Sequence, residues 1–185
     1  MRINMIRELA LKNRSYRRFY GEKKIDEKTL RELVDIARNT PSAANRQPLQ
    51  YRLVCDDETN SRVYDCLGWA GYYKDWDGPV AEERPSAYII MVTPQDVNPQ
   101  WDEGIAGQTI LLAATEMGLG GCMIGNFGAG SVKEALSLPE YLSPMLIVAI
   151  GKPAETVVLE EVEDGESIAY YRDEQDVHHV PKRKL

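Results

Sequence analysis

The chain lacks the patterns that most directly indicate a metal centre, a disulfide framework or a membrane span. Its three cysteines, Cys55, Cys66 and Cys122, are an odd number at wide spacing, with no CxxC pair. We therefore expect reduced thiols and a cytoplasmic protein. No run approaches the ~18 consecutive apolar residues of a transmembrane helix, and the N-terminus has no apolar signal-peptide core. We expect neither a metal site nor a membrane partner.

Positive charge is also scarce. Lys and Arg number 22 against 29 Asp and Glu, which gives a formal net charge of −7. Because a protein dedicated to nucleic acid needs a positive surface to meet the phosphates, we expect no nucleic-acid partner. The same scarcity draws attention to two places where basic residues do cluster, one near each end of the chain.

Length and hydrophobic patterning predict one domain over residues 1–185. The chain has 185 residues, 43% of them hydrophobic, with no internal repeat and no linker. Helices and strands mix without strict βαβ alternation, so the α+β class is favoured. The expected helices are a short one ending near residue 13, then 26–40, 59–67, 102–117 and 131–138. The expected strands are 51–55, 87–92, 122–124 and 146–151.

Several familiar motifs are absent or fail on context. The glycines of 118–125 superficially match a dinucleotide fingerprint, but a helix is expected before them and a strand after, which is the reverse of that motif. We expect a glycine C-cap instead. Ser131, the expected cap of the 131–138 helix, lacks the following glycine of a nucleophile elbow. His178 and His179 have no partner at metal-ligand spacing and are expected to be a solvated tail pair.

The two basic clusters suggest an anionic ligand. Arg14, Ser15 and Arg17 follow the first helix, and Lys182–Lys184 lie at the other end of the chain. Arginine forks and a serine hydroxyl suit a phosphate or another planar anion. Taken alone, each cluster also fits a bland alternative, a solvated basic turn or a frayed tail. Together, in an acidic chain, they favour one anion held by both ends of the polypeptide.

The loop 41–48 is closed by proline at both ends and is rich in small and amide residues. Asn45 and Gln47 can donate and accept hydrogen bonds, as a group that contacts the edge of a heterocycle must. A polar surface loop is the alternative.

Taken together, these segments resemble the nitroreductase family of FMN-dependent oxidoreductases. The resemblance is carried by NRSYRRF at 13–19, PSAANRQP at 41–48, DEGIAGQTILLAATEMGLGGCMIG at 102–125, the strand and GKP of 146–153, and VPKR at 180–183. Asn13 stands where the family usually has an arginine, and Leu49 where it usually has a tryptophan. The resemblance implies a central mixed or antiparallel sheet flanked by helices, and a homodimer with the active site at its interface.

The resemblance also implies site residues. The FMN phosphate would be held by Arg14, Ser15, Lys182 and Arg183. Arg17 would lie near N1 and O2 of the flavin ring, and Ile124, Gly125 and Asn126 along its N5 edge. The residues implied to reach the partner subunit's flavin are Pro41, Ser42, Ala43 and Asn45. No side chain is expected to be catalytic, because the flavin carries the chemistry.

The implied activity is an FMN-dependent reductase that oxidises NADH or NADPH and reduces a small-molecule acceptor by a ping-pong mechanism. A nitroaromatic, a quinone or an enone is the expected acceptor. Residues 69–86 form a long aromatic connection, and Trp69 and Trp76 in it could form a lid over the substrate or pack on the partner subunit. The alternatives are a dehalogenating or flavin-fragmenting enzyme of the same fold, a non-catalytic flavin-binding protein and a non-flavin interaction domain.

Overall fold

A four-stranded antiparallel sheet lies at the centre of the computed structural model, which describes residues 5–99 and 101–185. Its strands, in spatial order, are β1 (Gln50–Val54), β2 (Ala87–Pro94), β4 (Leu142–Gly151) and β3 (Gly120–Ile124). Every residue of β2 from Ala87 to Thr93 is buried, as expected of a central strand. The prediction of an α+β fold built on an antiparallel sheet is confirmed.

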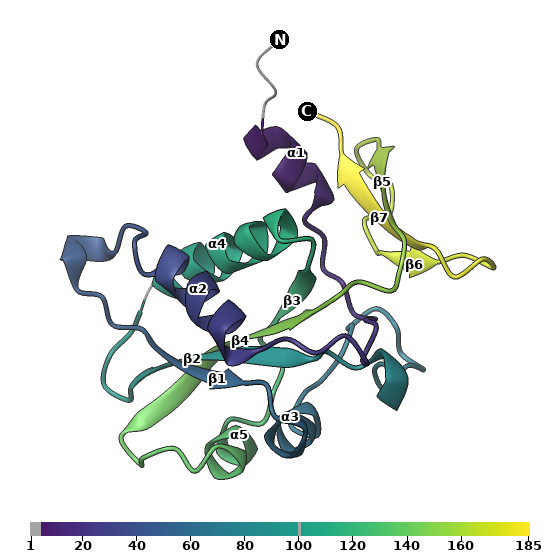
Figure 1. The fold of residues 1–185 in the computed structure, drawn as a ribbon. Helices are drawn as coiled ribbons and strands as arrows, with labels where there is room; N and C mark the ends of the chain where they lie inside the picture. Colours follow the sequence, from purple (N-terminus) through teal and green to yellow (C-terminus); the bar gives the residue numbers. More distant parts are fainter. Residues whose placement is uncertain (1–4, 100) are drawn as a thin grey trace.

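Helices cover both faces of this sheet (Figure 1). Helices α2 (Glu27–Ala37) and α4 (Asp102–Glu116) pack on one face, and α3 (Asp57–Tyr64) and α5 (Ala129–Ala135) on the other. Strand β2 serves both layers because successive side chains alternate. Ile89 and Met91 pack with α2 and α4, whereas Tyr88 and Ile90 join the cluster that contains residues of α3 and α5. No helix in the described part of the chain is long and apolar enough to cross a bilayer.

Helix ends follow local capping chemistry. Asp26 caps α2 as predicted, accepting a 2.8 Å hydrogen bond from the backbone N–H of Thr29. Asp56 caps α3 in the same way, so that helix begins two residues earlier than predicted and ends at Tyr64. The prediction that Ser131 caps a helix is wrong, because α5 begins at Ala129 and Ser131 lies inside it.

The glycine turn after α4 behaves as a C-cap, as predicted. Gly118 adopts a φ of +73°, and the N–H of Leu119 donates to the carbonyl of Ala114 at 2.8 Å. The chain then turns directly into β3. Two short 3-10 helices, η1 (Ala43–Asn45) and η2 (Ala81–Glu83), lie in the long connections.

The C-terminal region forms a second sheet that the sequence analysis missed. Its order is β5 (Val157–Val162), β7 (His178–Arg183) and β6 (Tyr171–Arg172), with β5 and β7 parallel. This sheet rises beside α1 (Met5–Lys12), so α1 and strand β7 lie on the same side of the molecule (Figure 1). The interpretation of residues 178–179 as a solvated pair is wrong for His178, which is 1% exposed.

Candidate functional site

The basic segment after α1 is fixed between strand β3 of the main sheet and the residues that follow strand β4. The N–H of Tyr16 donates to the carbonyl of Gly121 in β3 at 3.0 Å, and the N–H of Ala154 donates to the carbonyl of Arg18 at 3.0 Å. Close approach of Tyr16 to β3 requires glycine at 120, where a Cβ would lie 2.6 Å from a ring carbon of Tyr16. The backbone of this segment is therefore placed by the sheet.

The side chain of Glu155 holds the same basic segment through hydrogen bonds. Its side chain is 2% exposed, and its carboxylate accepts hydrogen bonds from the backbone N–H groups of Arg17 and Arg18, the latter at 3.2 Å. The second carboxylate oxygen forms an ion pair with Arg172 of β6. Glu155 therefore ties the basic segment to the C-terminal sheet, and no sequence pattern had singled it out.

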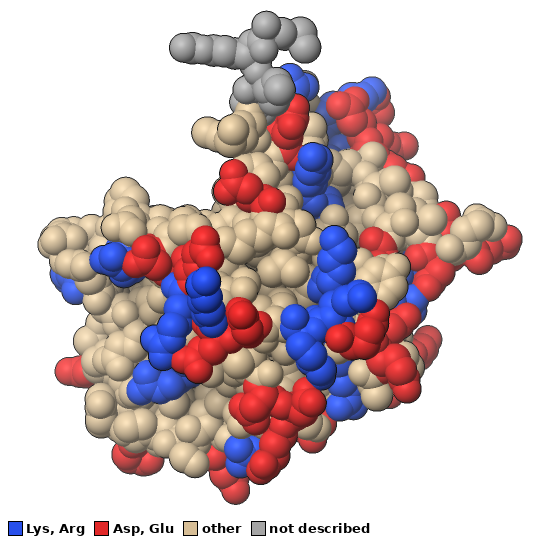
Figure 2. Space-filling model, viewed as in Figure 1, with Lys and Arg blue, Asp and Glu red and all other residues tan. Residues whose placement is uncertain are grey.

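These contacts bring both ends of the chain to one pocket of about 330 Å³. Its lining comes from the end of α1, the basic segment, α4 and the C-terminal sheet. The lining residues are Ala10, Asn13, Arg14, Ser15, Arg17, Gln108, Tyr170, His178, Val180 and Lys182. None of them is acidic, although acidic and basic side chains interleave over the visible face of the molecule (Figure 2). We call this the cationic pocket.

The cations of this pocket are available to a ligand. In the described part of the chain, Arg14, Arg17 and Lys182 form no ion pair with a carboxylate. Arg14 donates to the carbonyl of Ala10, and its Nε is buried without a partner. The Arg17 guanidinium lies 4.8 Å from the ring centre of Tyr170 and donates to the carbonyl of Ser15 at 3.3 Å. Burial lowers the pKa of Arg14, a penalty that a bound anion would relieve.

His178 is the most deeply buried polar residue of the lining. Neither ring nitrogen has a hydrogen-bond partner, and Nδ1 lies 3.7 Å from Oε2 of Glu155. The rings of Tyr73 and Tyr170 meet it edge-on, with centroids 5.9 and 5.5 Å away. Burial, with the nearby charges of Arg17 and Arg172, lowers the pKa of His178 to about 4, so its imidazole is neutral near pH 7.

Other predicted site residues lie outside the lining of the cationic pocket. Arg183 ends β7, is exposed, and pairs with Val162 of β5. Ile124 ends β3, three residues beyond Gly121 and therefore about 10 Å along the strand. Next to it, a Cβ added at Gly125 would meet no atom within 4 Å, so the backbone there faces open space. The carbonyl of Asn126 accepts a 2.8 Å hydrogen bond from Gly68.

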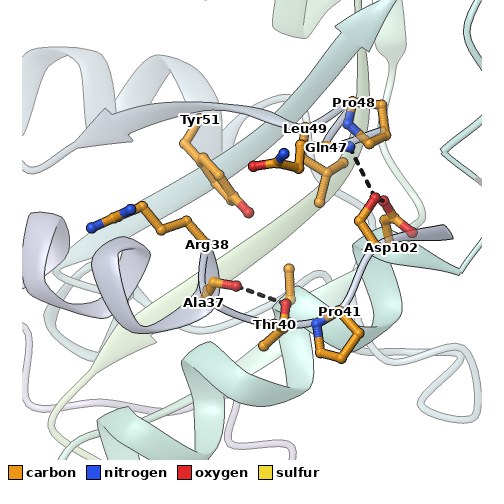
Figure 3. Close-up of a pocket in the computed structure, with 11 residues that line it drawn as sticks. Ala37, Arg38, Thr40, Pro41, Gln47, Pro48, Leu49, Tyr51 and Asp102 are labelled. Carbon is orange, nitrogen blue, oxygen red and sulfur yellow. Dashed lines mark hydrogen bonds between the residues drawn. The ribbon is translucent and has the colours of Figure 1, made fainter. Parts of the chain in front are cut away.

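The loop 41–48 lines a second pocket, of about 210 Å³, between α2, β1 and α4 (Figure 3). Asp102, which is 7% exposed, accepts a 2.6 Å hydrogen bond from the Ser42 hydroxyl. The Ser42 oxygen in turn accepts from the N–H of Gln47 at 2.9 Å. This chain of hydrogen bonds holds the loop although Asn45 and Gln47 have φ near +50°. Pro41 and Ser42 line the pocket, whereas Ala43 and Asn45 lie outside it.

The two tryptophans of 69–86 have different surroundings. Trp69 packs against Tyr64, with ring centroids 5.7 Å apart, and Gly78 at φ +115° approaches its ring so closely that a Cβ would lie at 2.6 Å. Trp76 lies along an open hollow of about 440 Å³ that Arg18, Tyr72 and Tyr73 also line. Trp69 is thus anchored to the body, and Trp76 borders space that a ligand could enter.

Comparison with known proteins gives a consistent result. The model of the nitroreductase family matches residues 10–85 and 94–152. A protein of Methanothermobacter thermautotrophicus named "Putative NADH dehydrogenase/NAD(P)H nitroreductase" is 26% identical over 167 residues, which cover 86% of this chain and 83% of that protein.

Solved structures show the same fold. A nitroreductase family protein from Clostridium novyi NT is 26% identical with a TM-score of 0.66, over 80% of this chain and 84% of that one. A structure from Clostridium difficile R20291, named an FMN-dependent nitroreductase, is 23% identical with a TM-score of 0.65, over 80% of this chain and 87% of that one.

Proposed function

The chain belongs to the nitroreductase family, and on that premise we propose that it is an FMN-dependent oxidoreductase that transfers hydride from NADH or NADPH to an electron-poor small molecule. The single observation that carries the proposal is the cationic pocket, in which Arg14, Ser15, Arg17 and Lys182 converge from both ends of an acidic chain. The names of the relatives support it, since one is called an NAD(P)H nitroreductase and another an FMN-dependent nitroreductase.

The residues of the cationic pocket fit a phosphate ester. Arginine forks can bind phosphate oxygens in pairs, lysine adds a point charge, and the Ser15 hydroxyl adds a donor. The unpartnered Nε of Arg14 is a buried donor that still needs an acceptor. Arg14, Ser15 and Lys182 would hold the phosphate of FMN, and Arg183, exposed beside Lys182, adds positive charge near it.

The ring would lie toward the end of β3. Strand β3 leads from Gly121, which pairs with Ser15, to its end at Ile124, and the open space beside Gly125 leaves room for a planar group. Ile124, Gly125 and Asn126 would border the N5 edge, and Arg17 would place its charge near N1 and O2. When bound, FMN would accept a hydride from the nicotinamide and would pass it to a nitroaromatic, a quinone or an enone.

A homodimer completes this proposal. Helix α1 buries none of its side chains, and its apolar residues Met5, Ile6 and Leu11 are 61%, 77% and 55% exposed. Because a short isolated helix is marginal in water, a second copy packed on this face would stabilise it. In that dimer Pro41, Ser42, Ala43 and Asn45 would reach the flavin of the partner subunit.

The dimer has a direct test. Replacing Leu11 with Glu should shift the protein toward monomer in light scattering and lower its FMN content. Tyr141→Glu is the matched control, since Tyr141 is 61% exposed, close to the 55% of Leu11, and lies outside the proposed interface, in the turn before β4. A Leu11→Glu protein that scatters as wild type and keeps its flavin would contradict the proposed interface.

Residues 69–86 would border the acceptor, with Trp76 as the contact residue. Trp76→Ala should change the ratio of kcat/KM between a nitroaromatic and a quinone while FMN affinity stays unchanged. Trp69→Ala should instead lower Tm, because its ring packs against Tyr64 and Gly78. Equal losses for all acceptors in both variants, together with a lower Tm, would show that both tryptophans serve packing alone.

The activity itself is tested by spectroscopy. The purified protein, loaded with FMN if needed, should show a flavin spectrum that anaerobic NADH or NADPH bleaches and that an added nitroaromatic or quinone restores. A protein that binds FMN but is not bleached would be a flavin carrier. A protein that does not bind added FMN would contradict the proposal entirely.

A further inference from the structure

His178 is a polar group of the cationic pocket that neither the sequence motifs nor the packing explains. It lines the pocket, it is 1% exposed, and both of its ring nitrogens lack partners. A buried polar atom without a hydrogen bond is destabilising, so natural proteins rarely keep one without a reason. A residue that served packing alone would be replaced by an apolar side chain without this cost.

We propose that His178 is a binding residue of the cationic pocket, and that one of its ring nitrogens hydrogen-bonds directly to bound FMN. The inference rests on the proposed function, because it takes FMN as the occupant. It adds to the arginine, serine and lysine ligands a neutral group that those cations cannot replace.

The surroundings of the imidazole leave the pocket as the place for a partner. Glu155 faces Nδ1 but lies beyond hydrogen-bond distance at 3.7 Å, and its carboxylate already serves two backbone N–H groups and Arg172. The rings of Tyr73 and Tyr170 present their edges, and Arg17 and Arg172 present only donors and positive charge. His179, the next residue, points its ring to two carboxylates of the C-terminal sheet.

The neutral state of the ring decides what it can contact. A neutral imidazole offers one donor and one acceptor, whereas the arginines and Lys182 only donate. A sugar-alcohol hydroxyl of FMN can use either nitrogen, while a phosphate oxygen can use only the donor. Both possibilities predict a hydrogen bond between His178 and FMN. Riboflavin lacks the phosphate, so comparing its binding with that of FMN distinguishes a contact to a hydroxyl from a contact to the phosphate.

The first test measures stability and affinity separately. His178→Leu removes both unpartnered nitrogens, so the FMN-free variant should melt no lower than FMN-free wild type. Its Kd for FMN should nevertheless rise by about 10-fold or more. His178→Asn places an amide near the position of Nδ1, and His178→Gln places one near that of Nε2. One of these two variants should therefore recover part of the affinity for FMN that His178→Leu loses. His179→Gln is the matched control and should bind FMN as wild type does.

Riboflavin refines the result. A loss that is equal for FMN and riboflavin assigns the contact to a hydroxyl or the ring, and a loss confined to FMN assigns it to the phosphate. Both outcomes support the proposal. A His178→Leu protein that binds both flavins as tightly as wild type overturns it, whatever its Tm.

A second measurement keeps His178 in place and so does not depend on how the His178 variants fold. The chain has only two histidines, so His179→Gln leaves a single imidazole to observe by ¹⁵N NMR. Addition of FMN should shift the resonance of one ring nitrogen, and an unchanged imidazole spectrum with FMN bound would contradict the inference. Failure of wild type to bind FMN at all would instead overturn the proposed function.

Discussion

The two faces of strand β7 carry adjacent histidines in opposite situations. His179 lies between Glu160 and Asp173, with Nε2 2.9 Å from Asp173, and stacks on Tyr171 at 4.7 Å. Its hydrogen bonds with Asp173 and then Glu160 raise its pKa. His178, on the other face, has no hydrogen-bond partner, and its pKa is lowered to about 4.

The difference separates a structural face from a binding face. Alternation along a strand sends neighbouring side chains to opposite sides, so a pair of histidines need not act together. On the outer face the polar groups satisfy one another and join β5, β6 and β7. On the pocket face, hydrogen-bond donors and acceptors lack partners. A polar ligand that supplies those partners gains the most binding free energy there.

The largest expected effect is on the pocket face, at Glu155. Glu155→Ala would leave two backbone N–H groups without their acceptor and Arg172 with Asp176 as its remaining carboxylate partner, at a cost of about 3–5 kcal/mol. Urea unfolding of the FMN-free protein measures this, and Glu160→Ala on the outer face, where the carboxylate is more exposed, is the control. If Glu155→Ala lowers the free energy of unfolding by less than about 1 kcal/mol, Glu155 does not hold the basic segment in place.

The next effect concerns Arg17, also on the pocket face. If its charge favours the reduced form of the cofactor, Arg17→Ala should lower the two-electron potential by roughly 30–65 mV, which corresponds to a charge-assisted hydrogen bond of about 1.5–3 kcal/mol. Arg17→Lys should recover part of this, and Arg14→Ala should weaken FMN retention with little change in potential. Reductive titrations against reference dyes decide, and an unchanged potential in FMN-loaded Arg17→Ala would make Arg17 a phosphate ligand instead.

The smallest effect is on the outer face and depends on pH. Because the pKa of His179 is raised in the folded state, its stabilisation is fully present below its unfolded pKa of 6.5 and is lost as pH rises through the folded pKa. The Tm of wild type should therefore fall more steeply from pH 6 to pH 8 than that of His179→Gln. Parallel melting curves for the two proteins over this range would contradict the role of the His179 cluster.

His178 should show the opposite dependence. Its folded pKa of about 4 lies below the unfolded value of 6.5, so the unfolded chain takes up a proton first as pH falls. Wild type should lose stability from pH 6.5 toward pH 4, and His178→Gln should lose less. Melting curves of His178→Gln that fall as steeply as those of wild type would show that His178 is not held neutral by its surroundings.

The same contrast shows how far sequence reasoning reaches. The buried strands β2 and β4 and the helix α4 were predicted because long apolar or periodic runs determine them locally. The convergence of the two basic clusters was also predicted, because the charges stand out in an acidic chain. Pairing in the C-terminal sheet was not, since β5 has no fully buried residue and β7 holds a proline and four charged or histidine positions.

The missed pocket residues share one cause. Gln108, Tyr170 and His178 enter the lining only through tertiary contacts, and Glu155 gains its role from residues more than 130 positions earlier in the chain. Their sequence context is unremarkable, and only the fold shows which face each side chain occupies. The assigned roles of Pro41, Ser42, Ala43 and Asn45 remain predictions that depend on a second subunit.

The central claim is that the cationic pocket binds the phosphate of FMN, and a paired titration tests it most directly. FMN and riboflavin are titrated into flavin-free wild type and into the Arg14→Ala/Lys182→Ala double variant, at fixed salt. We expect wild type to bind FMN at least ~100-fold more tightly than riboflavin, because loss of two charge-assisted contacts costs about 3 kcal/mol or more. The double variant should bind the two flavins with similar, weak affinity. Equal affinities of wild type for FMN and riboflavin would contradict the claim.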